Sequence, residues 1–342
     1  MSDINKSAIS KSGSATSYDL HIDTALTRVS VAYKQDESKY IANKVFPEVP
    51  VLKQSDKVWI LDKNDLLRNE TKKRAPGTES AGRGYALSTT DYFCDVYGIH
   101  ADIPREYLAN SDIPNWDMQV AGSLVNDLLI DRERNFITNM FTTDLWADQG
   151  TPNDATGHAT NSTWPYFIYF SDGADSDPLG VIRTGKQKIQ TNTGFQPNTL
   201  VVGQEVHDIL ALHPDIKELI KYTQTGIGDL RGYALMAQLL GVDNYLVGSA
   251  VHASNVEGAT AAYAYTFGKN MLLCYTPKVA GLLQPASGYI FEWTGLSGLG
   301  YNVTMDKWWM REINSWRIEG EMAYDQKIVG SDLGLYFSGA VA

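Results

Sequence analysis

The amino-acid sequence predicts an α+β fold in which a compact mixed unit sits between long, extended elements. Residues 112–142 carry apolar side chains three and four positions apart, which is typical of one long amphipathic helix. Residues 316–325 alternate apolar and charged side chains, as a half-buried antiparallel strand does. Residues 196–300 hold short strand-like and helix-like stretches in turn, which indicates a compact α+β unit.

The N-terminal residues 1–45 are predicted to form an arm. They begin polar, and their later apolar positions, such as Leu26 and Ile41, are too few to build a core of their own. Pro47 and Pro50 follow and favour an extended path, because proline disfavours helix at the residue before it. We therefore expect the arm to lie along another surface.

Residues 46–100 are predicted to form a long hairpin with a polar tip. Stretches 58–61 and 92–97 are rich in strand formers, and the residues between them hold the basic run 72–74 with several Gly and Pro residues, as loops do. Residues 53–83 carry eight basic and five acidic side chains, so this segment has a net charge of +3 while the rest of the chain has −14. This segregation suits docking of the tip onto an acidic surface of another copy of the chain.

The long periodic stretch 112–142 is expected to act as a strut. It would span roughly 40 Å, which is longer than a small domain is wide. Ser111 or Asp112 would cap this helix, with Pro114 in its first turn. A second helix is predicted over 178–194, after a loop-rich stretch.

The second half of the chain is predicted to contain shorter elements and then longer strands. Within 196–300 we expect a strand at 198–202, helices at 205–212 and 216–222, a helix capped by Asp229 and closed by Gly241, and strands at 245–247, 262–267 and 271–275. The alternating strand at 316–325 is followed by a turn at Gly330 and by residues 333–337, which are predicted to form its partner.

Composition excludes several classes of protein. The chain has 342 residues and a formal net charge of −11, which argues against a strongly cationic binder of nucleic acid or membranes. Residues 1–20 lack the apolar core of a secretory signal, and no apolar run reaches the ~18 residues of a membrane helix. Cys94 and Cys274 lie outside any CxxC spacing, so they indicate neither a disulfide scaffold nor a zinc ribbon, and they fit a reducing compartment.

Motifs for catalysis, cofactors and metals are missing, so we predict no catalytic, cofactor-binding or metal site. Nucleotide-binding glycine patterns and a GxSxG nucleophile turn do not occur, and the histidines do not have metal-ligand spacing. Asp172, Asp175 and Asp177 form the most metal-like cluster, but an acidic turn before a helix N-terminus at Pro178 explains them better.

An enzyme remains the main alternative from another class. It would be built on the 196–300 unit, where His207, Asp208 and His213 lie near predicted helices. A convergent pocket with perturbed titrating groups would favour this alternative.

Three stretches of sequence and the order of the elements resemble the major capsid proteins of tailed bacteriophages. The stretches are Tyr40-Ile41-Ala42-Asn43-Lys44-Val45-Phe46-Pro47, Lys72-Lys73-Arg74-Ala75-Pro76-Gly77-Thr78-Glu79-Ser80 and Tyr92-Phe93-Cys94-Asp95-Val96-Tyr97. The order of arm, basic-tipped hairpin, strut helix, inserted α+β unit and final strands covers almost the whole chain. A minor head or decoration protein is the nearest alternative within the virion.

The resemblance implies a division of the chain. Residues 1–45 would be the N-terminal arm and 46–100 the extended loop. Residues 101–195 and 301–342 would form the peripheral domain, with 112–142 as its spine helix, and 196–300 would form the inserted axial domain.

The resemblance also implies a function and partners. Many copies would self-assemble into hexamers and pentamers of an icosahedral head shell that encloses double-stranded DNA. Assembly would take place in the host bacterial cytoplasm with scaffolding and portal proteins, a decoration protein could bind outside, and the packaged DNA would be contacted weakly and without specificity. No membrane partner is implied.

Contacts between subunits are expected on the loop and beside it. The expected residues are Phe46, Trp59, Lys72, Lys73, Arg74 and Arg83. Some relatives cross-link a loop lysine to an asparagine of an adjacent subunit, and the lysines to consider are Lys57, Lys63, Lys72 and Lys73. The sequence identifies no partner asparagine.

Overall fold

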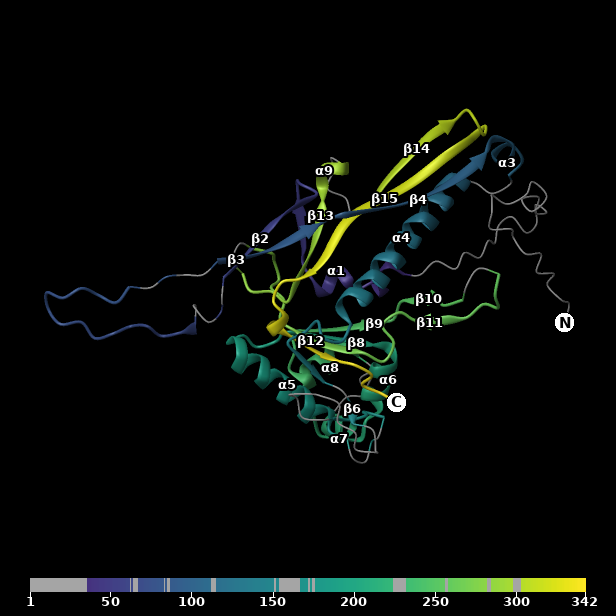
Figure 1. Cartoon of the computed structure of the whole chain (residues 1–342). Coiled ribbons are helices and arrows are strands. Elements are labelled where there is room, and N and C mark those ends of the chain that lie inside the picture. The colour runs from purple at the N-terminus through teal and green to yellow at the C-terminus, as the bar shows by residue number, and fades with distance from the viewer. Residues whose placement is uncertain are drawn as a thin grey trace.

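The computed structural model describes residues 36–61, 63, 67–82, 84, 87–111, 115–150, 152–153, 167–171, 173, 176–223, 232–255, 258–281, 284–297 and 303–342. These residues form a unit built on a long sheet, a second unit built on a smaller sheet, and a hairpin that projects from the first unit (Figure 1). The predicted α+β class is confirmed.

The first unit is built on a long sheet. Its strands are β1 (Glu48–Val51), β4 (Asp95–Pro104), β13 (Gly288–Trp293), β14 (Thr304–Met310) and β15 (Ser315–Ile328). Hydrogen bonds connect them in the order β1-β13-β15-β14, and β4 also pairs antiparallel with β15 over residues 315–324. Buried and partly exposed residues alternate along β15, which confirms the half-buried strand predicted at 316–325.

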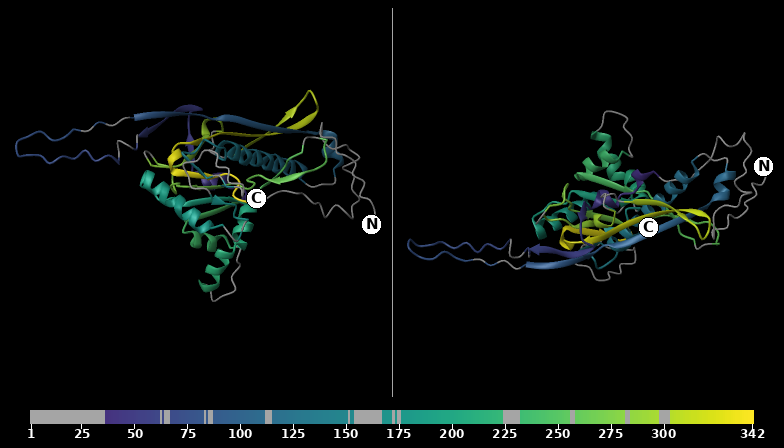
Figure 2. Two further views of the ribbon diagram at one scale, coloured as in Figure 1. Left: turned by 60° about the horizontal axis from the view of Figure 1, so that its bottom comes forward. Right: turned by 90° about the horizontal axis from the view of Figure 1, so that it is seen from above.

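Helix α4 (Trp116–Met140) packs along one face of this sheet, as Figure 2 shows. Its residues Leu124, Leu128 and Phe136 are buried against the sheet, which confirms a long helix within the predicted range 112–142. The N-cap is Asn115, with a left-handed φ of 54°, rather than Ser111 or Asp112. Asn tolerates this region better than most residues do, because its short side chain can hydrogen-bond locally.

The predicted hairpin is confirmed as β2 (Ser55–Leu61) paired antiparallel with β3 (Leu87–Phe93). It extends away from both units in the same general direction as the long sheet (Figure 2). The expectation that 92–97 forms one arm of the hairpin is wrong. The strand breaks at Cys94, and residues from Asp95 onward pair with β15 instead.

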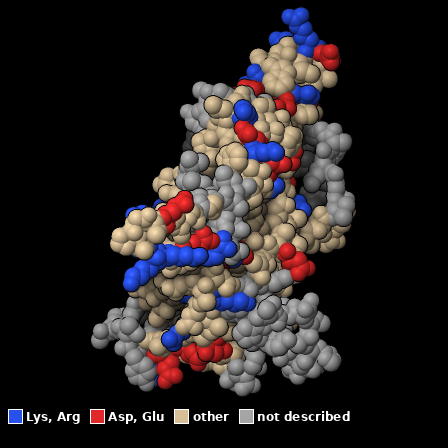
Figure 3. Space-filling view, turned by 60° about the vertical axis from the view of Figure 1, so that its left-hand side comes forward, with Lys and Arg blue, Asp and Glu red and all other residues tan. Residues whose placement is uncertain are grey.

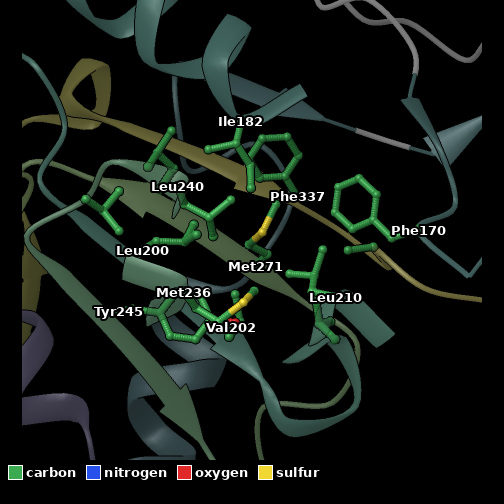
Figure 4. Packing of buried hydrophobic residues seen from close by; sticks show 14 of the residues in the cluster. Phe170, Ile182, Leu200, Val202, Leu210, Met236, Leu240, Tyr245, Met271 and Phe337 are labelled. Atoms are coloured by element: carbon green, nitrogen blue, oxygen red, sulfur yellow. The ribbon is translucent and has the colours of Figure 1, made fainter. Parts of the chain in front are cut away.

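The second unit is an α/β layer structure. Its strands, in the order β5-β16-β12-β8-β9, are β5 (Asp148–Gly150), β16 (Gly334–Phe337), β12 (Met271–Cys274), β8 (Thr199–Gly203) and β9 (Asn244–Gly248). Its helices are α5 (Pro178–Thr193), α6 (Gln204–Leu212), α7 (Pro214–Thr223) and α8 (Tyr233–Leu240). Ile182, Leu210 and Met236 reach from these helices toward Leu200 and Phe337 in the sheet, forming a continuous apolar core (Figure 4).

Sequence signals at the ends of α5 and α8 are confirmed. The Asp177 carboxylate accepts a 2.8 Å hydrogen bond from the Gly180 N–H and caps α5. Gly194 and Gly241 end their helices with φ of 81° and 62°, in the left-handed region that glycine enters without steric cost. The predicted cap Asp229 lies outside the described residues, and the N-cap of α8 is Gly232 instead.

The sheet pairings divide the chain differently from the predicted ranges. Residues 333–337 do not pair with the strand at 316–325, because β16 lies in the second sheet between β5 and β12. All four β16 residues are buried, as expected of a central strand covered on both faces. Conversely, β13 falls in the predicted 196–300 unit but pairs with β1 and β15 of the long sheet.

The predicted arm is shorter than residues 1–45. Tyr40, Ile41 and Val45 are buried in the chain's own core, where helix α1 (Ala42–Val45) packs on α4. The Glu133 carboxylate accepts hydrogen bonds from the N–H groups of Ile41 and Ala42, at 2.9 and 3.1 Å, and holds this segment on the helix. Residues 1–35 lie outside the described residues.

Short elements complete the described chain. They are η1 (Glu37–Lys39), α3 (Arg105–Asn110), α9 (Thr294–Ser297), η2 (Ser331–Leu333), the pair β6 (Pro152–Asn153) and β7 (Phe167–Ile168), and the pair β10 (Val251–Ala253) and β11 (Tyr263–Tyr265).

Candidate self-assembly surfaces

Large apolar side chains are exposed on the hairpin and beside it. Trp59 on β2 is 58% exposed and Phe93 at the end of β3 is 54% exposed. Leu52, in the turn that leads into β2, is 83% exposed. Large apolar residues that share one protruding element are typical of an interaction surface.

The loop beyond the hairpin carries the predicted basic run. Lys72, Lys73 and Arg74 are all exposed. Within the described part of the loop, Arg68 forms an ion pair with Glu70 at 2.7 Å, whereas no ion pair joins the basic run to another described residue. Figure 3 views the side that carries the hairpin and shows Lys and Arg side chains in a band across the middle of this face. The basic run is therefore available to a second molecule.

Two further expected contact residues have different outcomes. Phe46 is fully buried inside its own chain, where its ring meets Phe136 edge to face at a centroid distance of 5.3 Å. The expectation that Phe46 contacts another subunit is therefore wrong, because its side chain has no surface left to offer. Arg83 lies outside the described residues.

The lysines considered for cross-linking are not equivalent. Lys63 forms an ion pair with Asp332 of η2 in its own chain. Lys57 is exposed on β2 opposite Asp91, and Lys72 and Lys73 are exposed on the loop. The intrachain pair leaves Lys63 less free to move than the two loop lysines.

The face of the long sheet that points away from α4 carries a row of acidic side chains, which we call the outer acidic row: Asp306, Glu319 and Glu321. The register places Asp306 on β14 directly opposite Glu319 on β15. Nearby, Arg317 donates two hydrogen bonds, of 2.7 and 2.8 Å, to the Asp102 carboxylate. Among the described residues, no ion pair neutralises the outer acidic row.

The outer acidic row was not predicted from the sequence, although one sequence pattern indicated part of it. The alternation over 316–325 was enough to place Glu319 and Glu321 on one face of a strand. Nothing in the sequence brings Asp306 beside them, because strand register depends on contacts between distant segments.

The histidines of the enzyme alternative serve packing in this structure. His207 lies 2.9 Å from the Tyr245 hydroxyl through its Nδ1 atom, and both side chains are buried. Asp208 accepts a hydrogen bond from the Gln204 amide on the same helix. These contacts join α6 to β9 and stabilise the second unit.

His213 lies between a serine and an aspartate but has the wrong hydrogen-bond pattern for a general base. Its Nε2 atom is 2.8 Å from the Ser176 Oγ, and its Nδ1 accepts a 3.3 Å hydrogen bond from the Asp215 backbone N–H. The Asp215 carboxylate lies 3.7 Å from Nδ1. An Nδ1 atom that accepts from a backbone N–H leaves the ring proton on Nε2, and this tautomer donates to Ser176 instead of accepting the serine proton. The arrangement ties the α6–α7 junction to the segment before α5.

The described residues were compared with the requirements of a metal site and of a membrane-spanning helix. Asp172 and Asp175 lie outside the described residues, and Asp177 is engaged as a helix cap. Over the described ranges, His, Cys, Asp and Glu side chains form no group of three suited to a metal ion. In the same part of the chain, every helix is too short or too polar to cross a membrane.

Comparison with known proteins gives matches to phage capsid proteins. A family model described as "Phage major capsid protein E" matches residues 169–263. The major capsid protein of Burkholderia phage BcepMu is 25% identical over 279 residues, which cover 80% of this chain and 84% of the relative. That of Pseudomonas phage JBD67 is 25% identical over 328 residues, which cover 94% of this chain and 97% of the relative.

Solved structures agree with these matches. A phage-related protein from Bordetella bronchiseptica superposes with a TM-score of 0.66 at 20% identity, covering 93% of this chain and 97% of that chain. The capsid of cyanophage P-SCSP1u gives a TM-score of 0.61 at 12% identity, covering 95% of this chain and 94% of that chain. The fold is that of the tailed-phage capsid proteins. In sequence and in fold, the chain is similar to phage major capsid proteins.

Proposed function

We propose that copies of this chain assemble into hexamers and pentamers of an icosahedral head shell that encloses the double-stranded DNA of a tailed phage. The observation that carries this proposal is the projecting hairpin, whose apolar and basic side chains find no cover in their own chain. A second copy supplies the missing surface. The match to two major capsid proteins over most of the chain supports the same function.

Burial of the hairpin on a neighbour supplies free energy for assembly. A tryptophan side chain offers roughly 150–250 Å² of surface. Covering about 100 Å² of the exposed part of Trp59 would contribute about 2–3 kcal/mol. Each subunit of a closed shell repeats this contact, so modest local free energies accumulate into a stable particle.

Charge complementarity selects the surface of a neighbour that the hairpin loop binds. We assign the outer acidic row of one copy as the surface that receives the basic run 72–74 of its neighbour. Opposite charges on the two surfaces favour this register over contacts between like surfaces, because like charges that face each other cost free energy.

The regions of the chain take roles in this shell. The segment before Tyr40 is the N-terminal arm, the hairpin and its loop overlap a neighbour, the long-sheet unit is peripheral, and the second unit is axial. Scaffolding and portal proteins would take part in assembly in the host cytoplasm, and a decoration protein would bind from outside. With a net charge of −11, the chain holds DNA weakly, which allows the DNA to be packaged and released.

Deletion of residues 74–84 tests the proposal. The described residues of this range, 74–82 and 84, are exposed, so we expect a folded subunit with unchanged circular dichroism that forms no stable shells. Size-exclusion chromatography with light scattering measures particle mass, and electron microscopy shows whether shells form. Thr78→Ala, which keeps the length and charge of the loop, should form normal shells. Normal shells from the deletion would contradict the proposal.

A further inference from the structure

The strand that leads out of the hairpin changes its pairing partner within one residue. Up to Phe93 it pairs with β2, and from Asp95 onward it pairs with β15. Cys94 lies at the break. On the β3 side, the hairpin therefore joins the long sheet through one residue that belongs to neither strand, while residues 52–54 join β1 to β2 on the other side. The direction of the hairpin depends on how the backbone is held at this junction.

Two side chains from different elements hold the backbone at this break. The Gln54 side-chain amide donates to the Cys94 carbonyl oxygen at 3.1 Å, while the Cys94 N–H donates to the Gln54 carbonyl oxygen at 2.9 Å. The Asp325 carboxylate on β15 accepts a 3.0 Å hydrogen bond from the Phe93 N–H. Gln54 thus ties the break to the hairpin, and Asp325 ties it to the long sheet.

Packing beneath the break limits its rotation. The Cys94 side chain is completely buried, and the neighbouring Tyr92 ring stacks on Phe291 of β13 at a centroid distance of 4.6 Å with 14° between the ring planes. Turning the backbone at Cys94 would expose the thiol or separate the stacked rings. Packing alone, however, gives the N–H of Phe93 and the C=O of Cys94 no side-chain partner, and the two hydrogen bonds from Gln54 and Asp325 add a restraint on the backbone at these groups.

We propose that Gln54 and Asp325 are positioning residues that set the direction in which the hairpin leaves the long sheet. The length of the hairpin makes this direction matter. From Cys94 to Thr78 an extended chain spans up to about 50 Å, so a rotation of about 10° at the break moves the loop by about 9 Å. A displacement of that size takes the basic run away from its partner surface. Only this consequence for assembly rests on the proposed function.

Distance measurement between two spin labels tests the proposal on the full-length chain without requiring shells. The labels are placed at Thr89→Cys on β3 and Ser123→Cys on α4, both exposed positions. The native Cys94 and Cys274 are buried, and burial raises the pKa of each thiol to about 12, so they should remain unlabelled. Labelled chains diluted into excess unlabelled chain report distances within one subunit. We expect one narrow distribution.

Matched variants separate positioning from general destabilisation. Asp325→Ala and Gln54→Ala should each broaden or shift the distance distribution while the thermal unfolding midpoint stays within a few degrees of the parent. Asp325→Asn retains an oxygen that accepts from Phe93 N–H and should keep the narrow distribution. Glu321→Ala removes an acidic residue of the same strand that does not touch the break. This variant should also keep the narrow distribution.

The distance measurements distinguish failure of this inference from failure of the proposed function. An unchanged distribution in the Asp325→Ala, Gln54→Ala double variant, or a broad distribution in the parent chain, would overturn the inference even if shells form normally. If the distances behave as expected while the parent forms no shells, the positioning roles stand and the proposed function fails. With both correct, electron microscopy should show misshapen or incomplete shells for Asp325→Ala and regular shells for Asp325→Asn.

Discussion

Phe46 and Trp59 show how large apolar side chains are divided between the core and the exposed surface of the chain. Both are aromatic residues in or beside extended segments near the N-terminus. Phe46 is fully buried against Phe136, whereas Trp59 remains 58% exposed. The difference follows from their neighbours, because α1 turns Phe46 into the core while the hairpin carries Trp59 away from it.

Alanine substitution should separate the roles of these two residues. Phe46→Ala removes a large buried ring and leaves a cavity, so we expect the free energy of unfolding to fall by about 3–5 kcal/mol. Trp59→Ala should change it by less than about 0.5 kcal/mol, as at other exposed positions, and should instead reduce the yield of shells. Urea unfolding of dissociated subunits and light scattering of assembly reactions measure the two effects. A reversed order of the two stability losses would refute this assignment.

Helix α4 joins three segments of the first unit through charged residues that point inward. Arg132 is buried, and its Nη1 atom lies 3.6 Å from a Glu48 oxygen on β1 and 3.7 Å from a Glu292 oxygen on β13. The adjacent Glu133 binds the backbone at Ile41 as described above. A charged cluster inside a helix–sheet interface is costly unless its charges are balanced, so this junction is sensitive to protonation.

Stability of this junction should depend on pH through Glu292. Burial raises the pKa of Glu292 to about 7, and the nearby Glu48 carboxylate adds to the shift. Because the pKa in the folded chain is higher than in the unfolded chain, the stabilising effect of protonation is complete below the unfolded value and is lost as pH rises through about 7. We expect the free energy of unfolding to decrease by about 1–3 kcal/mol between about pH 5 and pH 8.

Glu292→Gln should reduce this dependence, because the amide is neutral at every pH in the range. Burial also raises the pKa of Glu133 to about 7, so the part of the slope that comes from Glu133 should remain. Urea unfolding at several pH values measures the slope. Glu319→Gln, at a half-buried position on the outer face of the sheet, provides the control and should keep the parent slope. An identical slope in the parent and in Glu292→Gln would show that ionisation of Glu292 does not govern the junction.

For the whole molecule, charge is segregated between a basic loop and an acidic body. Residues 53–83 carry +3 while the remainder carries −14, and the outer acidic row lies on the long sheet, apart from the loop. A single copy does not bring these surfaces together in the described structure. The segregation therefore favours contact between copies.

Charge reversal should test the pairing of these surfaces. The variant with Lys72→Glu, Lys73→Glu and Arg74→Glu should fail to form shells, because its loop would face like charges. Adding Asp306→Lys, Glu319→Lys and Glu321→Lys to that variant should restore part of the assembly. Light scattering at several salt concentrations measures the effect, and raised salt should weaken assembly of the parent, because exposed charges are screened. If the combined variant folds but assembles no better than the triple loop variant, this pairing is excluded.

Much of the local structure could be predicted from the sequence. Periodicity located α4 and the alternating strand β15, cap residues located the ends of α5, and composition located the hairpin with its basic loop. The same signals failed where pairing between distant segments decides the outcome. Residues 333–337 carry a strong strand pattern, yet nothing local indicates that they pair with β12 rather than β15.

The candidate site divides in the same way. The basic run 72–74 is visible in the sequence because charge and loop composition are local properties. The burial of Phe46, the assembly of the outer acidic row and the hold of Asp325 on Phe93 depend on segments up to 232 positions apart along the chain. The sequence by itself determined which stretches became helix, strand and charged loop, since these follow from the side chains of near neighbours. Only the tertiary structure decided which surfaces are buried and which remain exposed, because strand register and packing are set by the contacts of the whole chain.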